Sequence, residues 1–498
     1  MLFSSFTFLF QFLPATLLAF AAARRHSQRA GILVLLTASL IFYGAWNPAY
    51  LLLLAGSMAM NFTLGLLMED RKRRRVVGIF GVTIDLALLA YFKYSNFLLD
   101  SLGAVTGAQF APANVVLPLG ISFFTFQQIA YLVDVMRGAK VERDVVSYAL
   151  FVSFFPHLIA GPLVHHAEMI PQFKRTSSHR AAVLAARAVA IFSAGLFKKV
   201  MIADELSQFV SPIFTHLDAG GTVPPHFAWL ATLAYTLQIY FDFSGYSDMA
   251  IGLALLFGVR LPVNFRSPYR CLSIIEFWRC WHITLSRFLR DYLYIPLGGN
   301  RQGSGRRYLN LMTTMLLGGL WHGAGWNFVI WGGLHGAYLV TNHLWRKLRG
   351  TDGKPKAAAT RVLSWSVTFG SVVLAWVFFR AATLGGALRM FSGMFGYPLE
   401  GPAYVPSGVF TTFGLPIWVG SDGFFWLGAT MMTSAFVIAI GLPNALQILG
   451  YREYRRPPEH VGTLRWRPSA GWAALVAAAL TVSLFGMWQR LEFLYFQF

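Results

Sequence analysis

Two histidines of this sequence lie in strongly hydrophobic stretches, where a polar ring loses its hydration. His322 follows Leu320 and Trp321, and His335 lies further along the same glycine-rich stretch. A polar ring in a membrane-length apolar segment indicates a functional residue, and an imidazole can take a proton from a hydroxyl near neutral pH. On these grounds His322 is either a catalytic base or a structural imidazole held by hydrogen bonds.

Residues 274–292 contain a further histidine among tryptophans and arginines. At about 100° per residue, the apolar side chains fall on one arc of roughly 120°, and most of the polar ones, His282 among them, fall opposite. The pattern predicts one amphipathic helix that either lies in the headgroup plane or lines a polar cavity entered from the cytosol. His282 favours the cavity, in which Arg279, Arg287 and Arg290 would bind phosphate.

Two carboxylates interrupt an apolar run at residues 230–259. Asp242 and Asp248 are costly in a membrane unless they pair with a cation or face water, and an unbroken helix places them on opposite sides. We interpret them chiefly as partners of arginines such as Arg266 or Arg270 that fix the fold.

The elements that must position these side chains are hydrophobic helices. The 498-residue sequence is 56% hydrophobic and 12% charged, whereas a soluble domain carries about 25% charge. Runs such as residues 32–46, 49–67, 76–98 and 470–487 approach the roughly 20 residues that cross a hydrocarbon core. Roughly eleven or twelve such segments, too long for barrel strands, predict an all-α polytopic integral membrane protein. No linker or repeat is visible, so residues 1–498 form one membrane domain by this interpretation.

The net charge of +20 comes from 41 basic and 21 acidic residues, and the basic clusters lie between the apolar runs. The positive-inside rule places such short loops, including the Lys198-Lys199 pair, in the cytosol. Because the charges form no single stripe, they indicate a lipid bilayer and not nucleic acid as the partner. With only Cys271 and Cys280, and without metal-ligand spacing, a phosphate loop or a serine elbow, the sequence gives no support to zinc, ATPase or serine-hydrolase chemistry.

Seven glycines occur from Gly318 to Gly336. On a continuous helix, the Cα atoms of His322 and His335 would be about 20 Å apart, with their side chains on different faces. The glycines favour a break of the helix in this stretch. At such a break, a histidine can reach a cavity.

Five ordered motifs make the sequence similar to the membrane-bound O-acyltransferase superfamily, and most similar to its bacterial alginate O-acetyltransferase branch. The motifs are Phe155-Pro156-His157-Leu158-Ile159-Ala160-Gly161-Pro162, residues 240–248, residues 276–283, residues 290–300 and Gly319-Leu320-Trp321-His322-Gly323. The similarity runs almost end to end, from Phe3 to the closing residues 493–498. One departure is Cys280, where relatives often have a second arginine, so no phosphate-binding role is carried over to this position.

The resemblance implies an activity. Members of the superfamily take an acyl group from a cytosolic thioester, commonly acetyl-CoA, and deliver it to a hydroxyl on the far side of the membrane. The histidine of the Trp-His-Gly motif, here His322, is the essential residue of the family, and His282 matches a second position that is His or Asn. The resemblance therefore implies a multi-pass enzyme of the bacterial inner membrane that binds no cofactor and uses acetyl-CoA as its donor substrate.

Together with the residue pattern, the resemblance predicts that acetyl-CoA places its phosphates near the arginines of residues 274–292 and its acyl arm near His322. His322 would remove the proton of the acceptor hydroxyl, and His282 would orient the thioester or stabilise the oxyanion. An acyl-histidine intermediate stays open as an alternative. Asp242, Ser244 and Trp321 are further candidates for substrate binding.

The acceptor and the partners follow only from the branch that the sequence resembles. Its acetyl groups reach an exopolysaccharide such as alginate or cellulose, often through a periplasmic SGNH-hydrolase-type protein with a serine nucleophile. We therefore expect such a partner beside the exopolysaccharide synthesis machinery. A D-alanyl transferase acting on teichoic acid is an alternative within the superfamily. Outside it, the intramembrane carboxylates fit a transporter, and His322 with His335 fits a haem protein.

Overall fold

The computed structural model describes residues 1–498 except residues 114, 175–180, 351–356, 407, 413–414, 455–463 and 488–498. The chain divides into two compact units. Unit 1 comprises Met1–Phe192, Met249–Pro262 and Arg452–Pro457, and unit 2 comprises Ser193–Asp248, Val263–Tyr451 and Pro458–Phe498. The single membrane domain expected from the sequence stays a prediction, and the closing motif at residues 493–498 lies outside the described residues.

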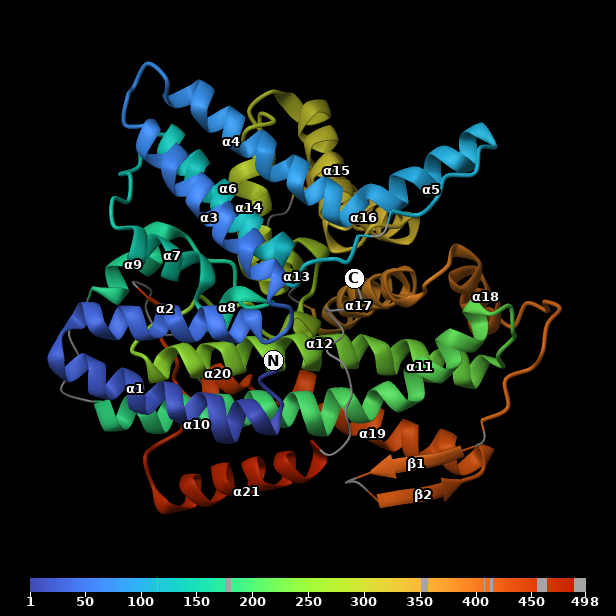
Figure 1. Ribbon diagram of the computed structural model, residues 1–498. Helices are drawn as coiled ribbons and strands as arrows, with labels where there is room; N and C mark the ends of the chain where they lie inside the picture. The colour runs from blue at the N-terminus through green and yellow to red at the C-terminus, as the bar shows by residue number, and fades with distance from the viewer. Residues whose placement is uncertain are drawn as a thin grey trace. The chain divides into compact units, whose positions relative to one another are not determined.

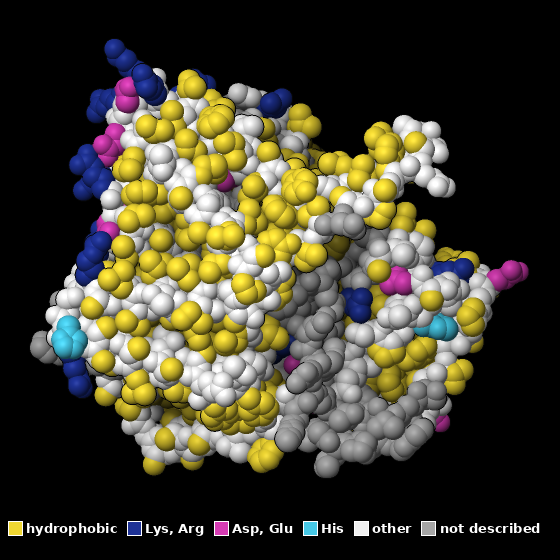
Figure 2. Space-filling model, in the orientation of Figure 1, with side chains coloured by type: hydrophobic (Ala, Val, Ile, Leu, Met, Phe, Trp, Pro, Cys, Tyr) yellow, Lys and Arg dark blue, Asp and Glu magenta, His cyan; other side chains and the backbone are white. Residues whose placement is uncertain are grey.

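The regular elements in the described part of unit 1 are helices (Figure 1). In chain order they are the π-helix η1 (Phe8–Phe12), α1 (Leu13–His26), α2 (Gln28–Gly44), α3 (Ala49–Leu67), α4 (Arg74–Leu89), the π-helix η2 (Ala90–Tyr94), α5 (Ser95–Thr106), α6 (Ile121–Met136), α7 (Val145–Ser153), α8 (Phe155–Leu158), α9 (His166–Phe173) and most of α10 (Ala181–Phe197). On α3 and α4, large apolar side chains such as Leu52 (79% exposed) and Val76 (72%) face outward. Figure 2 shows hydrophobic side chains spread over these two helices. A surface of this kind indicates contact with lipid.

Four helical segments of the described residues are long and apolar enough to cross a membrane. They are Ala49–Leu67, Arg74–Thr106, Ala358–Arg380 and Ser421–Gly441, and the shorter apolar helices are Gln28–Gly44, Ile121–Met136 and Ala470–Gly486. The predicted class of an all-α polytopic membrane protein is confirmed. The count of eleven or twelve segments stays a prediction.

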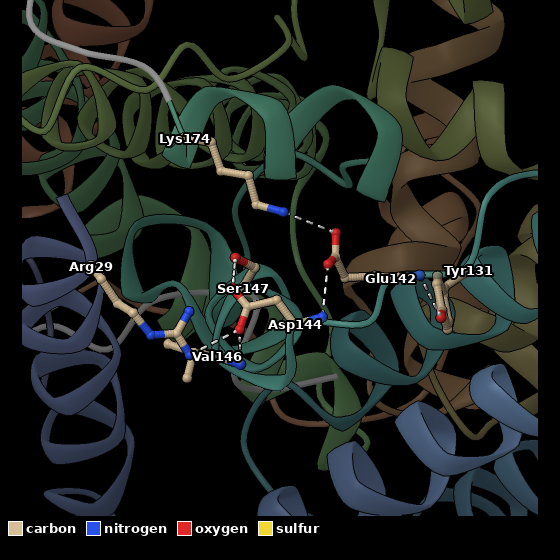
Figure 3. Close-up of polar contacts among 7 residues, drawn as sticks. All are labelled: Arg29, Tyr131, Glu142, Asp144, Val146, Ser147 and Lys174. Atoms are coloured by element: carbon tan, nitrogen blue, oxygen red, sulfur yellow. Dashed lines mark hydrogen bonds and ion pairs between the residues drawn. The ribbon is translucent and has the colours of Figure 1, made fainter.

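Charged residues of unit 1 gather where α7 begins (Figure 3). The Asp144 side chain caps α7, accepts a hydrogen bond from Ser147 Oγ (2.6 Å) and lies 3.2 Å from Arg29 Nη2. Glu142 accepts a hydrogen bond from the Asp144 backbone N–H (2.9 Å) and lies 3.5 Å from Lys174 Nζ. Basic residues next to apolar helices are thus held by acidic partners at a helix end, a location that suits the headgroup region.

Unit 2 contains the remaining helices and one antiparallel strand pair among its described residues. In chain order its elements are the π-helix η3 (Lys198–Asp204), α11 (Glu205–Asp218), most of α12 (Pro225–Leu256), the 3-10 helix η4 (Pro268–Arg270), α13 (Ile274–Cys280), α14 (Ile283–Leu289), the π-helix η5 (Arg290–Tyr294), α15 (Gly303–His322), α16 (Trp326–Arg349), α17 (Ala358–Arg380), α18 (Leu384–Phe395), β1 (Gly408–Thr412), β2 (Leu415–Val419), α19 (Ser421–Gly441), α20 (Ala445–Ile448) and α21 (Ala470–Gly486). In the strand pair, Gly408 lies opposite Val419.

The single amphipathic helix predicted for residues 274–292 is wrong, because the helix breaks after Cys280. Trp281 is extended (φ −101°, ψ 128°) and His282 is left-handed (φ 41°, ψ 54°), so α13 and α14 are separate helices. Tertiary packing overrides the helical period here: Trp281 is buried, with its ring centroid 5.0 Å from those of Phe265 and Trp376. The apolar arc counted across the whole segment therefore does not exist as one surface.

Glycines let α15 and α16 pack with almost no side-chain volume between them. A Cβ on Gly332 would overlap the carbonyl group of Met315 and lie 3.2 Å from the Cα of Gly319. A Cβ on Gly319 would in turn lie 3.0 Å from the Cα of Gly332. Small residues at such a crossing allow the two backbones to approach closely, as is common between helices in membranes.

The carboxylates of α12 pair with lysines. Asp248 Oδ2 lies 2.6 Å from Lys198 Nζ, and Asp242 Oδ1 lies 2.7 Å from Lys199 Nζ. Lys199 also pairs with Asp204. Lysines thus pair with both carboxylates, while Arg270 Nε donates to the carbonyl of Ile440 (2.6 Å). The expected arginine partners stay a prediction. The assignment of the two lysines to a loop was wrong, because both lie in η3 and the Lys199 side chain is only 3% exposed.

Candidate active site

His322 is the last residue of α15, and a break of the helix follows it. Gly323 and Gly325 have extended backbone, and α16 begins at Trp326. The break expected in the glycine-rich stretch is therefore present. The His322 side chain is buried, with its ring centroid 5.1 Å from that of Trp331. The break thus leaves an imidazole at a helix end, surrounded by aromatic rings.

His282 lies beside His322 and comes from the turn between α13 and α14. It occupies the N-cap position of α14, but its side chain does not cap the helix. The buried ring has its centroid 4.7 Å from that of Phe243, 6.2 Å from that of Trp321 and 6.4 Å from that of His322. Burial lowers the pKa of His282 to about 3. Its imidazole is therefore neutral at physiological pH.

Trp331 lies between His322 and the other histidine of the glycine-rich stretch. The ring centroid of Trp331 is 5.1 Å from that of His322 and 4.8 Å from that of His335. His335 Nδ1 accepts a hydrogen bond from Trp278 Nε1 (3.3 Å). Trp321, a candidate for substrate binding, is buried with its ring centroid 5.0 Å from that of His322. The structure thus places His282 and Trp321 next to His322, whereas Trp331 separates His335 from His322.

Arg279 belongs to a cluster of basic residues from three helices. The cluster surrounds His343 of α16 and consists of Arg279 on α13, Arg307 on α15 and Arg346 on α16. Burial, followed by the charges of Arg307, Arg346 and Arg279, lowers the pKa of His343 to about 4. Arg307 Nη2 lies 2.6 Å from His343 Nδ1, and Arg346 Nη2 donates to Ser273 Oγ (3.3 Å). Several guanidinium groups in one place suit a polyanion such as a phosphorylated ligand.

The other predicted phosphate-binding arginines have different surroundings. Arg290 is 62% exposed and donates two hydrogen bonds to Asp291, from Nε (2.7 Å) and Nη2 (3.1 Å). Arg287 is half-buried on α14. The roles of both arginines in phosphate binding stay predictions.

Asp242 and Ser244, the remaining candidates for substrate binding, lie on α12. Asp242 forms the ion pair with Lys199. Ser244 is buried, and its Oγ has no hydrogen-bond partner among the described residues. Their part in substrate binding also stays a prediction.

The residues that hold the turn of His282 were not among the predicted site residues. Asn264 is buried and accepts a hydrogen bond from Thr284 Oγ1 (2.6 Å). The available signal was a polar residue between Val263 and Phe265 in a short apolar run. Arg307 and Arg346 were missed as partners of Arg279 because they lie on separate helices, and spacing along one segment does not reveal such a cluster.

Two neighbouring imidazoles in a water-poor aromatic setting can move a proton and stabilise developing charge. A histidine can act as a general base toward a hydroxyl held within hydrogen-bond reach. A neutral imidazole can donate a hydrogen bond to an oxyanion, and this interaction is strong where water is excluded. Among the described residues, no group of three or more His, Cys, Asp and Glu side chains is placed to hold a metal ion.

The fold and the site define a polytopic membrane protein with two neighbouring buried histidines, each at a break between two helices. Residues 120–379 match the model of the membrane-bound O-acyltransferase family. The chain belongs to this family, and the resemblance drawn from its motifs is confirmed. The matched region contains His282, His322 and the arginines of the basic cluster.

Relatives with named activities cover most of the chain. The probable alginate O-acetylase of Azotobacter vinelandii is 45% identical over 410 residues, which cover 80% of this chain and 78% of the relative. The peptidoglycan O-acetyltransferase of Helicobacter pylori is 43% identical over 434 residues, 80% of each chain. The teichoic acid D-alanyltransferase of Bacillus subtilis is 25% identical over 283 residues, 54% of this chain and 70% of the relative.

Proposed function

We propose that this protein transfers an acetyl group from cytosolic acetyl-CoA toward a polysaccharide outside the bacterial inner membrane. The observation that carries the proposal is the placement of His282 beside His322, with ring centroids 6.4 Å apart, in a member of an O-acyltransferase family. Relatives named as O-acetylating enzymes share more than 40% identity over 80% of this chain, which favours acetyl over D-alanyl transfer.

The basic cluster of Arg279, Arg307 and Arg346 supports a nucleotide-bearing donor. Coenzyme A carries three phosphate groups, and guanidinium groups bind phosphate through paired, charge-assisted hydrogen bonds. Arg279 of this cluster lies on α13, the helix that ends just before the turn of His282. We propose that the cluster holds the phosphates while the acetyl thioester reaches the two histidines.

In the proposed reaction, the hydroxyl oxygen of the acceptor attacks the carbonyl carbon of the acetyl thioester, and His322 accepts the hydroxyl proton. His282 donates a hydrogen bond to the carbonyl oxygen, on which negative charge develops. The carbon–sulfur bond then breaks, and the proton held by His322 passes to the thiolate. The products are an acetyl ester and coenzyme A with a free thiol, so atoms and charge balance.

The acceptor is proposed as a hydroxyl of an envelope or extracellular polysaccharide, or of a periplasmic carrier that passes the group on. The relatives are named for alginate and for peptidoglycan, so the shared chemistry is a sugar hydroxyl. A periplasmic partner with a serine nucleophile of the SGNH type, working beside polysaccharide synthesis, would carry the acetyl group from the membrane protein to the polysaccharide in this scheme.

Membranes that contain the full chain, incubated with labelled acetyl-CoA and the periplasmic partner, test the proposal. Label should appear in the partner or polysaccharide, and His322→Ala should abolish this transfer while the protein accumulates normally. His226→Ala, which removes an exposed histidine of the same unit, is the matched control and should transfer label at the wild-type rate. Near-normal transfer by His322→Ala contradicts the assignment, and label moving only from a D-alanyl donor supports the alternative enzyme.

A further inference from the structure

The short helix α14 is not capped by its own N-cap residue. The first N–H groups of a helix need acceptors from outside the helix, and the side chain of the N-cap residue usually supplies one. Here the N-cap residue is His282, and its side chain accepts no capping hydrogen bond. Asn264, which precedes Thr284 by 20 residues, supplies the acceptors.

Three hydrogen bonds join Asn264 to the first residues of α14. The backbone carbonyl of Asn264 accepts from Ile283 N (3.0 Å). Its side-chain Oδ1 accepts from Thr284 N (3.3 Å) and from Thr284 Oγ1 (2.6 Å). Asn264 thus satisfies both the backbone and the side chain of the residues that directly follow His282.

Asn264 is itself fixed in place. It is 1% exposed, and its Nδ2 donates to Ser247 Oγ of α12 (3.3 Å). On the other side of His282, the carbonyl of Cys280 accepts a hydrogen bond from Arg266 N (3.0 Å). The segment that contains Asn264 therefore holds the chain both before and after the His282 turn.

The turn needs such support because His282 has a left-handed backbone (φ 41°). Among the described residues, only Ser267 shares this feature outside glycine. A bulky residue persists in this conformation only where the surrounding structure holds it. The same backbone turn brings the imidazole to within 4.7 Å of Phe243 and 6.4 Å of His322, measured between ring centroids.

We propose that Asn264 is a positioning residue that caps α14 in place of His282 and so directs the His282 imidazole toward His322. This proposal rests on the proposed acetyl transfer, in which His282 contacts the thioester oxygen. Asn264 touches no reacting atom, and its contribution passes through the orientation of His282.

Two substitutions at Thr284 test the link without removing Asn264. Thr284→Val keeps the shape of the side chain but loses the hydroxyl that donates to Asn264, whereas Thr284→Ser keeps it. In membranes with labelled acetyl-CoA, Thr284→Val should lower kcat by about tenfold without changing the KM for acetyl-CoA. Thr284→Ser should keep a rate near that of the wild type. Thr236→Val is the control, because the buried Thr236 hydroxyl donates to the carbonyl of Thr232 within its own helix (2.9 Å).

A double-mutant cycle separates positioning from general stability. Asn264→Leu should reduce kcat strongly in the wild-type background but add no further loss to His282→Ala, because the imidazole that it positions is then absent. An equal loss in both backgrounds, or equal rates for Thr284→Val and Thr284→Ser, overturns the positioning role. Absence of acetyl-CoA-dependent transfer by the wild type overturns the proposed function, and the positioning role falls with it.

Discussion

At His282, burial and backbone geometry act on the same side chain. Burial lowers the pKa of the ring to about 3, so the imidazole stays neutral. The left-handed turn brings this ring beside Trp321 and His322. In the proposed reaction, a neutral ring in this place is suited to donating a hydrogen bond, while His322 accepts the proton.

Substitution of His282 should separate the imidazole from the backbone turn. His282→Ala should reduce acetyl transfer by on the order of 100-fold, whereas His282→Asn should keep part of the activity because an amide also donates a hydrogen bond. His282→Gly accepts the left-handed backbone without strain and should be as inactive as the alanine variant. Initial rates per amount of protein in membranes measure the effect, and full activity of the glycine variant would show that only the turn matters.

Arg279 should act on donor binding and not on the chemical step. Arg279→Ala is expected to raise the KM for acetyl-CoA by on the order of tenfold at nearly constant kcat, since a guanidinium–phosphate contact is present in both ground and transition states. Arg279→Lys should be intermediate, because an ammonium lacks the paired geometry. Arg143→Ala, which removes an exposed arginine paired with Glu69, is the charge-matched control. A fall in kcat alone for Arg279→Ala would mean that this arginine acts in the chemical step and not in donor binding.

At the scale of helices, glycines set the position of His322 in two ways. Gly323 and Gly325 follow the end of α15 in extended conformation, and α16 starts directly after them. Gly319 and Gly332 let the backbones of α15 and α16 touch. A change in the spacing of the two helices therefore moves the end of α15 that carries the imidazole.

Two adjacent glycines of α16 provide a matched test of this spacing. A Cβ on Gly332 would overlap the carbonyl of Met315, whereas a Cβ on Gly333 would meet only the Leu316 side chain at an ordinary 3.5 Å. Gly332→Ala should lower both the thermal stability and the transfer rate, the latter by on the order of tenfold or more. Gly333→Ala should preserve the rate and gain about 1 kcal/mol of helix propensity. Equal behaviour of the two variants in thermal unfolding and rate assays would refute the close contact.

At the scale of the whole molecule, a mostly apolar chain keeps a few buried charges in pairs. The Asp248 and Lys198 side chains are 5% and 14% exposed and join α12 to η3. A buried pair adds little net stability compared with apolar residues of the same volume, but the loss of one partner leaves an uncompensated charge.

Removal of one partner of the Lys198–Asp248 pair should therefore cost more stability than replacement of both partners by apolar residues. Asp248→Leu alone should destabilise the fold by about 3–5 kcal/mol, whereas the double substitution Lys198→Met with Asp248→Leu should recover most of the loss. Thermal unfolding of detergent-solubilised protein measures both, and Arg143→Ala serves as a control for an exposed pair. A double variant that is as unstable as the single one would mean that Lys198 does not compensate the charge of Asp248.

Composition and local motifs determined the membrane class, the helical architecture and the family, and they made His322 the first candidate for the catalytic residue. These properties depend on the hydrophobic length of segments and on short runs of residues, which are visible along the chain. The glycine content likewise predicted the break after His322.

Tertiary structure alone decided the break at His282, the lysine partners of Asp242 and Asp248, and the convergence of Arg279 with Arg307 and Arg346. The physical reason is that these features depend on contacts between segments distant in sequence, such as the capping of α14 by Asn264. The periodic pattern within one segment does not contain this information. It therefore predicts one helix for residues 274–292, whereas the packing of Trp281 and the hydrogen bonds of Asn264 stabilise two.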